Sequence, residues 1–291
     1  MPLLPTLQFA DYVALAGVNW STLGKMRASP AHYAHAITHS RPPTPDQATG
    51  LAVHTLVLEP DEFARRYAVY TGEGTRASKE YKAFVADVAK DREVLKFGEY
   101  EEVSAMAAAV DQHPAAGPLF TSGWAERSFV WADPATGIEC KGRTDWLAFD
   151  GIVSGDAGQP DRQRVILVDL KTARSSDPRE FGRSAASYGY HLQLAHYRAG
   201  LRANGIEVSQ VLIVVVESSA PYDVCVYEVT DDQLARADAE VAALLARVKE
   251  CRDSDHWPGR SDEITPLDLP AWVMGMDDVM VAPEPALWGE T

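Results

Sequence analysis

The sequence has no apolar run long enough to cross a membrane, and it contains little cysteine. Its longest apolar runs, such as 211–216, are far shorter than the roughly 18 residues that a membrane-spanning helix needs. The three cysteines, at positions 140, 225 and 251, are too widely spaced for a CxxC-type metal site or an iron–sulfur cluster. The N-terminal stretch also lacks the basic region of a secretory signal. We therefore expect a cytoplasmic protein with reduced thiols and no membrane segment.

Basic residues are also scarce relative to acidic ones, 27 against 42, which gives a net charge of −15 and a pI near 4.9. A charge of this sign opposes nucleic-acid binding by the surface as a whole. The excess is uneven, however, because residues 217–291 contain 17 acidic and five basic residues, whereas residues 141–183 contain seven acidic and eight basic ones. The middle of the chain can therefore form a locally basic groove.

The pattern of apolar residues changes near residue 118. Before this point it predicts mainly helices, including 47–58, 78–91 and 98–112. After it, the pattern predicts strands at 125–132, 138–149 and 164–170, one long helix over 178–204, a strand pair at 210–217 and 223–229, and a helix over 231–250. This order predicts an α/β fold with a mixed central sheet flanked by helices.

The domain organisation that we expect is simple. Residues 1–260 form a single domain, with a helical N-terminal elaboration over 1–117 and the core over 118–260. Residues 261–291 form an acidic tail that contains prolines.

The most informative stretch is the apolar run from Val165 to Leu170, which presents Asp169 and then Lys171 near its end. Positions i and i+2 of a strand point to the same face, so the carboxylate and the ammonium lie together. The carboxylate can bind Mg²⁺, and the ammonium can hold a water molecule or neutralise a phosphate. The alternative is a surface ion pair at a strand end, which the spacing alone also allows.

Two further acids lie on the preceding predicted strands. Asp145 lies inside a strand-like run beside Trp146, where an aspartate is disfavoured by propensity and therefore needs a reason. Together with Asp169 it can supply oxygen ligands from adjacent strands. Glu126 on the strand before can join as a third carboxylate. The alternatives are a turn or edge acid for Asp145 and an exposed strand acid for Glu126.

Two helices add polar candidates. Gln193 and Tyr197 are four residues apart, so they project from one face of the predicted helix over 178–204 and can reach one bound group together. His54 lies on a largely apolar face of the predicted helix over 47–58. A lone histidine in such a place is more often a core residue than a ligand.

Taken together, these segments form a pattern that resembles the PD-(D/E)xK nuclease superfamily. They are Gly50 to His54, Gly142 to Asp145, Asp169 to Thr172, and the pair Gln193 and Tyr197. More closely they resemble the RecE-like exodeoxyribonucleases (exodeoxyribonuclease VIII) of phage and prophage recombination systems, which are related to RecB-type and lambda-exonuclease-type nucleases. The segments 21–23, 29–33, 58–60 and 255–259 also resemble that family. The aspartate in the D-x-K motif replaces the commoner glutamate.

The resemblance implies roles for these residues. Lys171 is then the catalytic lysine, Asp145, Asp169 and His54 belong to the metal site, and Gln193 with Tyr197 supports the lysine and the DNA phosphate. Glu126 is a further candidate ligand for Mg²⁺, for which Mn²⁺ can substitute. The chain lacks the four cysteines that an iron–sulfur cluster in some RecB-related nucleases requires, which places it with relatives that have no such cluster. Basic side chains near the site are expected to hold DNA phosphates: Lys141, Arg143, Arg174, Arg179 and Arg183.

The same resemblance implies a substrate and partners. We expect hydrolysis of linear duplex DNA from its ends, action in a ring of three or four subunits, and a possible single-strand annealing partner. Three alternatives remain open at this stage. A structure-selective or restriction-like endonuclease uses the same site, and a nuclease-fold protein can bind DNA ends without cutting them. The third alternative is a phosphohydrolase that is not a nuclease.

Overall fold

A computed structural model describes residues 7–39, 45–153 and 162–269. In the part of the chain before the main sheet, the elements are α1 (Phe9–Ala14), α2 (Trp20–Leu23), η1 (Gly24–Arg27), α3 (Pro30–Thr38), α4 (Pro45–Leu58), α5 (Pro60–Arg66), β1 (Tyr67–Tyr70), α6 (Lys79–Phe84), η2 (Val85–Ala89), β2 (Glu93–Lys96), α7 (Phe97–Gln112) and η3 (Gly117–Phe120). The core then contains β3 (Gly123–Ala132), β4 (Glu139–Val153), β5 (Arg162–Ala173), α8 (Pro178–Tyr188), α9 (Tyr190–Ala203), β6 (Glu207–Glu217), β7 (Val224–Glu228) and α10 (Asp231–Ser254).

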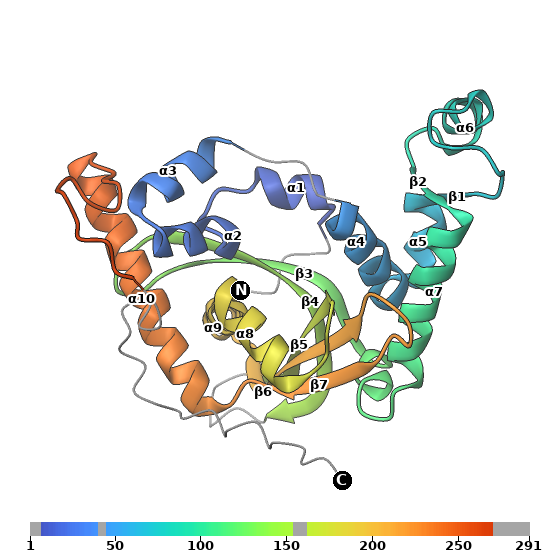
Figure 1. Cartoon of the computed structure of the whole chain (residues 1–291). Coiled ribbons are helices and arrows are strands. Elements are labelled where there is room, and N and C mark those ends of the chain that lie inside the picture. The colour runs from blue at the N-terminus through green and yellow to red at the C-terminus, as the bar shows by residue number, and fades with distance from the viewer. Residues whose placement is uncertain (1–6, 40–44, 154–161, 270–291) are drawn as a thin grey trace, which may run out of the picture.

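The main sheet has five strands in the order β3-β4-β5-β6-β7. All neighbouring pairs are antiparallel except β5 and β6, which are parallel and joined by the crossover through α8 and α9. The mixed sheet flanked by helices confirms the predicted fold class. Figure 1 shows β3 and β4 curving around α9, with α10 on one side and α4 and α7 on the other.

Two apolar cores cover the two faces of this sheet. On β6, Val211, Ile213 and Val215 belong to the core formed with α9, α10 and the N-terminal helices α2 and α3. The alternate residues of the same strand belong to a second core, formed with α4 and α7. Burial of both faces explains why β6 is apolar without interruption.

Two sequence predictions need correction. The helix predicted over 178–204 is two helices, because Gly189 adopts a left-handed conformation (φ 72°) that ends α8 and turns the chain into α9. The N-terminal elaboration is not purely helical, because β1 and β2 form a separate parallel pair. Four-residue strands far apart in sequence carry too short a pattern for detection. Among the described residues, no helix combines the length and hydrophobicity needed to span a membrane.

Candidate active site at the fork between β4 and β5

The site lies where the central strands separate. The ladder between β4 and β5 ends at the pair Trp146 and Val168, while β5 continues along β6 through Ala173. Asp145 and Asp169 are the next residues on the two diverging strands. The separation deprives the Leu170 amide of a strand partner, and this amide instead donates to Oδ2 of Asp145 at 2.9 Å. The fork therefore fixes the Asp145 carboxylate in place.

Asp169 and Lys171 share one face of β5, as their spacing predicts. Val165 and Leu167 of the same strand belong to the core beneath α9, so the alternation directs Asp169 and Lys171 toward that helix. Nζ of Lys171 lies 2.5 Å from Oδ2 of Asp169. The Asp169 side chain is 2% exposed and that of Lys171 17% exposed, which makes this a buried ion pair rather than a surface one.

Helix α4 brings His54 to the same place. Its Nδ1 atom lies 3.7 Å from Oδ2 of Asp145. The close approach of α4 depends on Gly50, where a Cβ atom would lie 3.0 Å from the Thr172 hydroxyl oxygen on β5. The glycine at the start of the predicted motif therefore serves packing, and the histidine one turn later reaches the carboxylates.

Glu126 lies where β3 departs from regular strand geometry. The β3–β4 register pairs Ala125 with Trp146 and Arg127 with Thr144, but the intervening pair, Glu126 opposite Asp145, is absent. Glu126 has φ of 51°, a conformation that a non-glycine residue adopts at a cost of order 1–3 kcal/mol. The carboxylates of Glu126 and Asp145 repel one another at this point of the two strands. A positively charged group is therefore needed to offset the repulsion.

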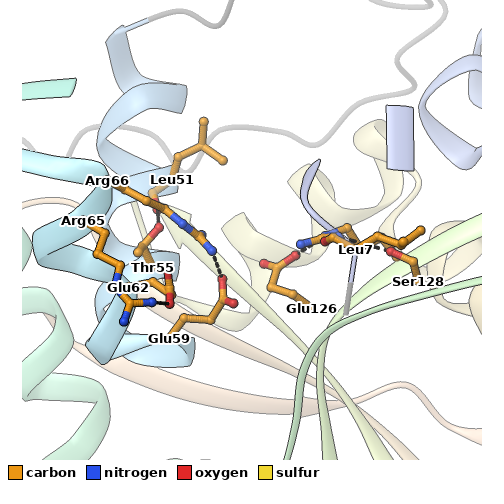
Figure 2. A network of polar contacts seen from close by, with 10 residues as sticks. Leu7, Leu51, Thr55, Glu59, Glu62, Arg65, Arg66, Glu126 and Ser128 are labelled. Atoms are coloured by element: carbon orange, nitrogen blue, oxygen red, sulfur yellow. Dashed lines mark hydrogen bonds and ion pairs between the residues drawn. The ribbon is translucent and has the colours of Figure 1, made fainter. Parts of the chain in front are cut away.

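Arg143 supplies part of that compensation. Its Nε lies 2.5 Å from Oε2 of Glu126, and its Nη1 donates to the Leu7 carbonyl at 2.8 Å and to the Ser128 hydroxyl at 3.1 Å. Figure 2 shows these three acceptors, together with a second group of ion pairs at the junction of α4 and α5. In that group, Arg66 lies 2.7 Å from Glu59.

The environment shifts the pKa values of the site. Burial, with the neighbouring Asp145, raises the pKa of Glu126 to about 7, although Arg143 opposes the shift. Burial likewise raises the pKa of Asp169 to about 6 against the opposing effect of Lys171. Burial and Lys171 lower the pKa of His54 to about 4. For Lys171, burial favours the neutral amine, but Asp169 and Asp145 outweigh it and raise the pKa. At neutral pH, His54 is therefore neutral and Lys171 is charged.

These side chains fit a divalent metal ion. One ligand atom from each of His54, Glu126 and Asp145 lies within 4.8 Å of the other two. Two carboxylate oxygens and a neutral imidazole nitrogen are an ordinary donor set for such an ion, and its charge would offset the repulsion between the facing acids. Asp169 adjoins this group but is engaged by Lys171.

On α9, Gln193 and Tyr197 project from one face, as their spacing predicts, and Nε2 of Gln193 lies 3.1 Å from the Tyr197 hydroxyl. The Tyr197 ring packs against Gly142, where a Cβ atom would lie 3.1 Å from the ring. The ring nearest the lysine belongs to Tyr190, whose centroid lies 5.1 Å from Nζ of Lys171. Sequence reasoning gave Tyr190 no role. Its spacing could have identified it: Tyr190 lies three residues before Gln193 and seven before Tyr197, which places all three side chains on one helix face.

Comparison with known proteins identifies the family. Residues 19–270 match the model of a family described as a PDDEXK-like domain of unknown function (DUF3799). The chain belongs to this family. The match includes every site residue named above, and it confirms the expected relation to the PD-(D/E)xK nucleases.

A solved structure agrees with the fold of this PDDEXK-like domain. A crystal structure of a proposed exonuclease from Eubacterium rectale superposes with a TM-score of 0.58 at 13% identity, covering 94% of this chain and 99% of the other. A phage-related exonuclease from Haemophilus somnus matches with a TM-score of 0.33 at 12% identity over 84% of this chain and 99% of the other. No curated protein matches the sequence. The family and the fold support a nuclease.

The five cations predicted to bind DNA fall into two groups in the PDDEXK-like domain. Lys141 is buried, and its ammonium donates to the carbonyls of Tyr12, Val13 and Leu15, so its three N–H donors are not available to a phosphate. Arg143 is held by Glu126. The remaining three are exposed: Arg174, which follows β5, and Arg179 and Arg183, one turn apart on α8. They have no ion-pair partner among the described residues.

Proposed function

We propose that this protein hydrolyses DNA phosphodiester bonds with the help of Mg²⁺, for which Mn²⁺ can substitute. The observation that carries the proposal is the meeting of a buried Asp169–Lys171 pair with His54, Glu126 and Asp145 at one fork of the sheet. An ion pair that served only stability would not need three more ligand-type side chains around it. Membership of the PDDEXK-like family supports the same conclusion.

Asp145, Glu126 and His54 would hold the metal. Asp169, which lies beside them, would be the fourth ligand. A bound divalent ion lowers the pKa of a water molecule and stabilises negative charge on the scissile phosphate. The Leu170 amide orients the Asp145 carboxylate, and Arg143 favours the ionised form of Glu126. His54 keeps a free lone pair because its pKa lies below neutrality.

Lys171 performs the part of the reaction that does not depend on metal coordination. Its ammonium is kept charged by Asp169 and Asp145 and is partly exposed, so it can donate to a non-bridging phosphate oxygen or hold the attacking water. Gln193 and Tyr197, bonded to each other on α9, are the proposed phosphate-facing support. The exposed guanidinium groups of Arg174, Arg179 and Arg183 provide phosphate contacts that carry no sequence preference.

The proposed substrate is linear duplex DNA, degraded from its ends in a recombination process of the phage type. The net charge of −15 opposes binding along a duplex interior, which favours a confined, locally basic site near Asp169 that receives an end. The proposed setting is the cytoplasm, with action as a trimer or tetramer and with a single-strand annealing protein as a partner.

The experiment incubates the purified protein with Mg²⁺ and linear duplex, closed circular duplex or single-stranded DNA. We expect small products from the linear duplex, intact circles, and no reaction in EDTA. Ca²⁺ should permit binding but little cutting. Nicking of closed circles as fast as degradation of linear DNA would establish an endonuclease instead. Binding of ends without any product, in either Mg²⁺ or Mn²⁺, would establish an end-binding protein.

A further inference from the structure

A row of four stacked rings passes beside the active site and ends at the surface of the protein. Tyr227 stacks on the buried Phe181 with centroids 5.3 Å apart, and Phe181 stacks on Tyr190 at 6.0 Å. Tyr190 in turn stacks on Tyr188 at 5.6 Å and an interplanar angle of 20°. Tyr188 ends the row with 68% of its surface exposed, and the described residues place no further ring against it.

The row passes directly beside the catalytic lysine. The Tyr190 ring that supports Tyr188 is the same ring that lies 5.1 Å from Nζ of Lys171. Only one aromatic ring therefore separates the Tyr188 surface from the ammonium that would act on the phosphate. Phe97 at the start of α7 is also exposed, but among the described residues it stacks on no other ring.

The backbone that carries Tyr188 is held firmly. Gly189 follows in a left-handed conformation, and a Cβ atom there would lie 2.9 Å from the Trp20 ring. Arg27 donates to the Ser187 carbonyl at 3.3 Å and to the Ala186 carbonyl at 3.4 Å, which ties down the last turn of α8. A ring that is exposed yet fixed in orientation is preorganised to bind a flat partner, because little conformational entropy remains to be lost.

We propose that Tyr188 is a stacking platform for an unpaired nucleobase at the end of the DNA substrate. The inference rests on the proposed function and extends it, because it makes the bound end a frayed or single-stranded one. Every base has a flat π face, so such a platform accepts any sequence, and base–aromatic stacking typically strengthens binding by about 5- to 100-fold per base. Stacking on Tyr188 would separate the terminal base from its complement and direct the adjoining phosphates toward Lys171.

The test measures binding in a background that cannot cut, so that it does not depend on activity. Lys171→Ala protein is titrated in Ca²⁺ with duplexes whose three-nucleotide overhang, 5′ or 3′, ends in 2-aminopurine. We expect quenching of this base by stacking on one of the two overhangs. Adding Tyr188→Ala should abolish the quenching and weaken binding about 5- to 100-fold, whereas Tyr188→Phe, which keeps the ring, should stay within twofold. Phe97→Ala is the matched control for loss of an exposed ring.

An abasic overhang of the same length completes the comparison. The Lys171→Ala protein that keeps Tyr188 should bind the base-containing overhang more tightly than the abasic one. The protein that also carries Tyr188→Ala should bind the two overhangs with equal affinity. An unchanged preference in Tyr188→Ala, or a loss of affinity in Tyr188→Phe as large as that in Tyr188→Ala, would overturn the platform. Such a result would leave the nuclease proposal intact, since that proposal fails only if protein with an intact Lys171 cleaves none of the tested DNAs.

Discussion

Two lysines on neighbouring strands have much in common but differ in their partners. Lys141 on β4 and Lys171 on β5 are both largely buried, and each lies near a tyrosine ring, at 5.2 Å from the Tyr12 centroid and 5.1 Å from the Tyr190 centroid. Lys141 is surrounded by neutral carbonyls, and burial lowers its pKa. Lys171 faces carboxylates, which raise its pKa in spite of burial. The partner, rather than the residue type or the degree of burial, decides in which direction the pKa of each lysine moves.

The largest expected effect is on cleavage when Lys171 is replaced. Lys171→Met keeps the aliphatic stem but removes the charge, and we expect kcat to fall about 10²- to 10³-fold, as for loss of one electrostatic donor. Single-turnover cleavage of a labelled linear duplex measures this, and calorimetric titration with Mn²⁺ should show that metal binding persists. By contrast, Asp145→Asn should weaken metal binding as well as turnover. Near-normal turnover in Lys171→Met would refute the role of the D-x-K motif.

The same substitution at Lys141 should have the opposite outcome. Lys141→Met leaves the carbonyls at the end of α1 without their donor, which costs about 1–3 kcal/mol of unfolding free energy. We expect a lower midpoint in urea denaturation, with kcat per folded molecule unchanged within about twofold. If Lys141→Met instead lost cleavage and kept its stability, the distinction between the two lysines would be wrong.

The sequence predicts the surroundings of Lys171 better than those of Lys141, for a physical reason. Asp169 and Lys171 interact through strand alternation, and Gln193 and Tyr197 through the helical repeat, so local spacing suffices for both pairs. The partners of Lys141 lie between 126 and 129 residues away in the sequence. No local pattern reveals such a contact.

The geometry around Glu126 was equally inaccessible to sequence analysis. On β3, Phe129 and Trp131 pack in the core under α9, so regular alternation would direct the other odd-numbered residues there too. Instead Ala125 packs in the opposite core, and the even-numbered Trp124 packs under α9. The alternation therefore slips by one residue at Glu126, where φ is positive. Strand propensity describes regular alternation and cannot predict a slip of one residue within a strand. The existence of β6, in contrast, is predicted by an apolar run that is buried on both faces.

Arg143 extends the comparison, because it is a cation whose partner is itself a candidate ligand. With the pKa of Glu126 at about 7, a proton competes with the metal below neutrality, so metal affinity should fall about tenfold between pH 8 and pH 6. Arg143→Gln removes the interaction that opposes protonation and should move this transition to higher pH. Metal titration by calorimetry across this range measures both effects. In Glu126→Gln the dependence should flatten, and an unchanged profile in that variant would exclude Glu126 as a ligand.

The smallest effects are expected from the cations without a protein partner. Arg174, Arg179 and Arg183 are exposed and extend from the end of β5 along α8, so each can neutralise one phosphate without fixing any atom of the fold. Replacing one of them by alanine should weaken DNA binding about threefold at moderate salt, with unfolding free energy and kcat unchanged. Each loss should also lower the slope of log affinity against log salt by about 1, because one fewer counterion is released. Binding titrations between 50 and 200 mM salt on linear duplex measure this slope, with Arg236→Ala on α10 as the control for loss of a charge far from β5 in sequence. If the slopes of Arg174→Ala, Arg179→Ala and Arg183→Ala all equalled that of the unmodified protein, the DNA would have to approach Lys171 from the side opposite α8.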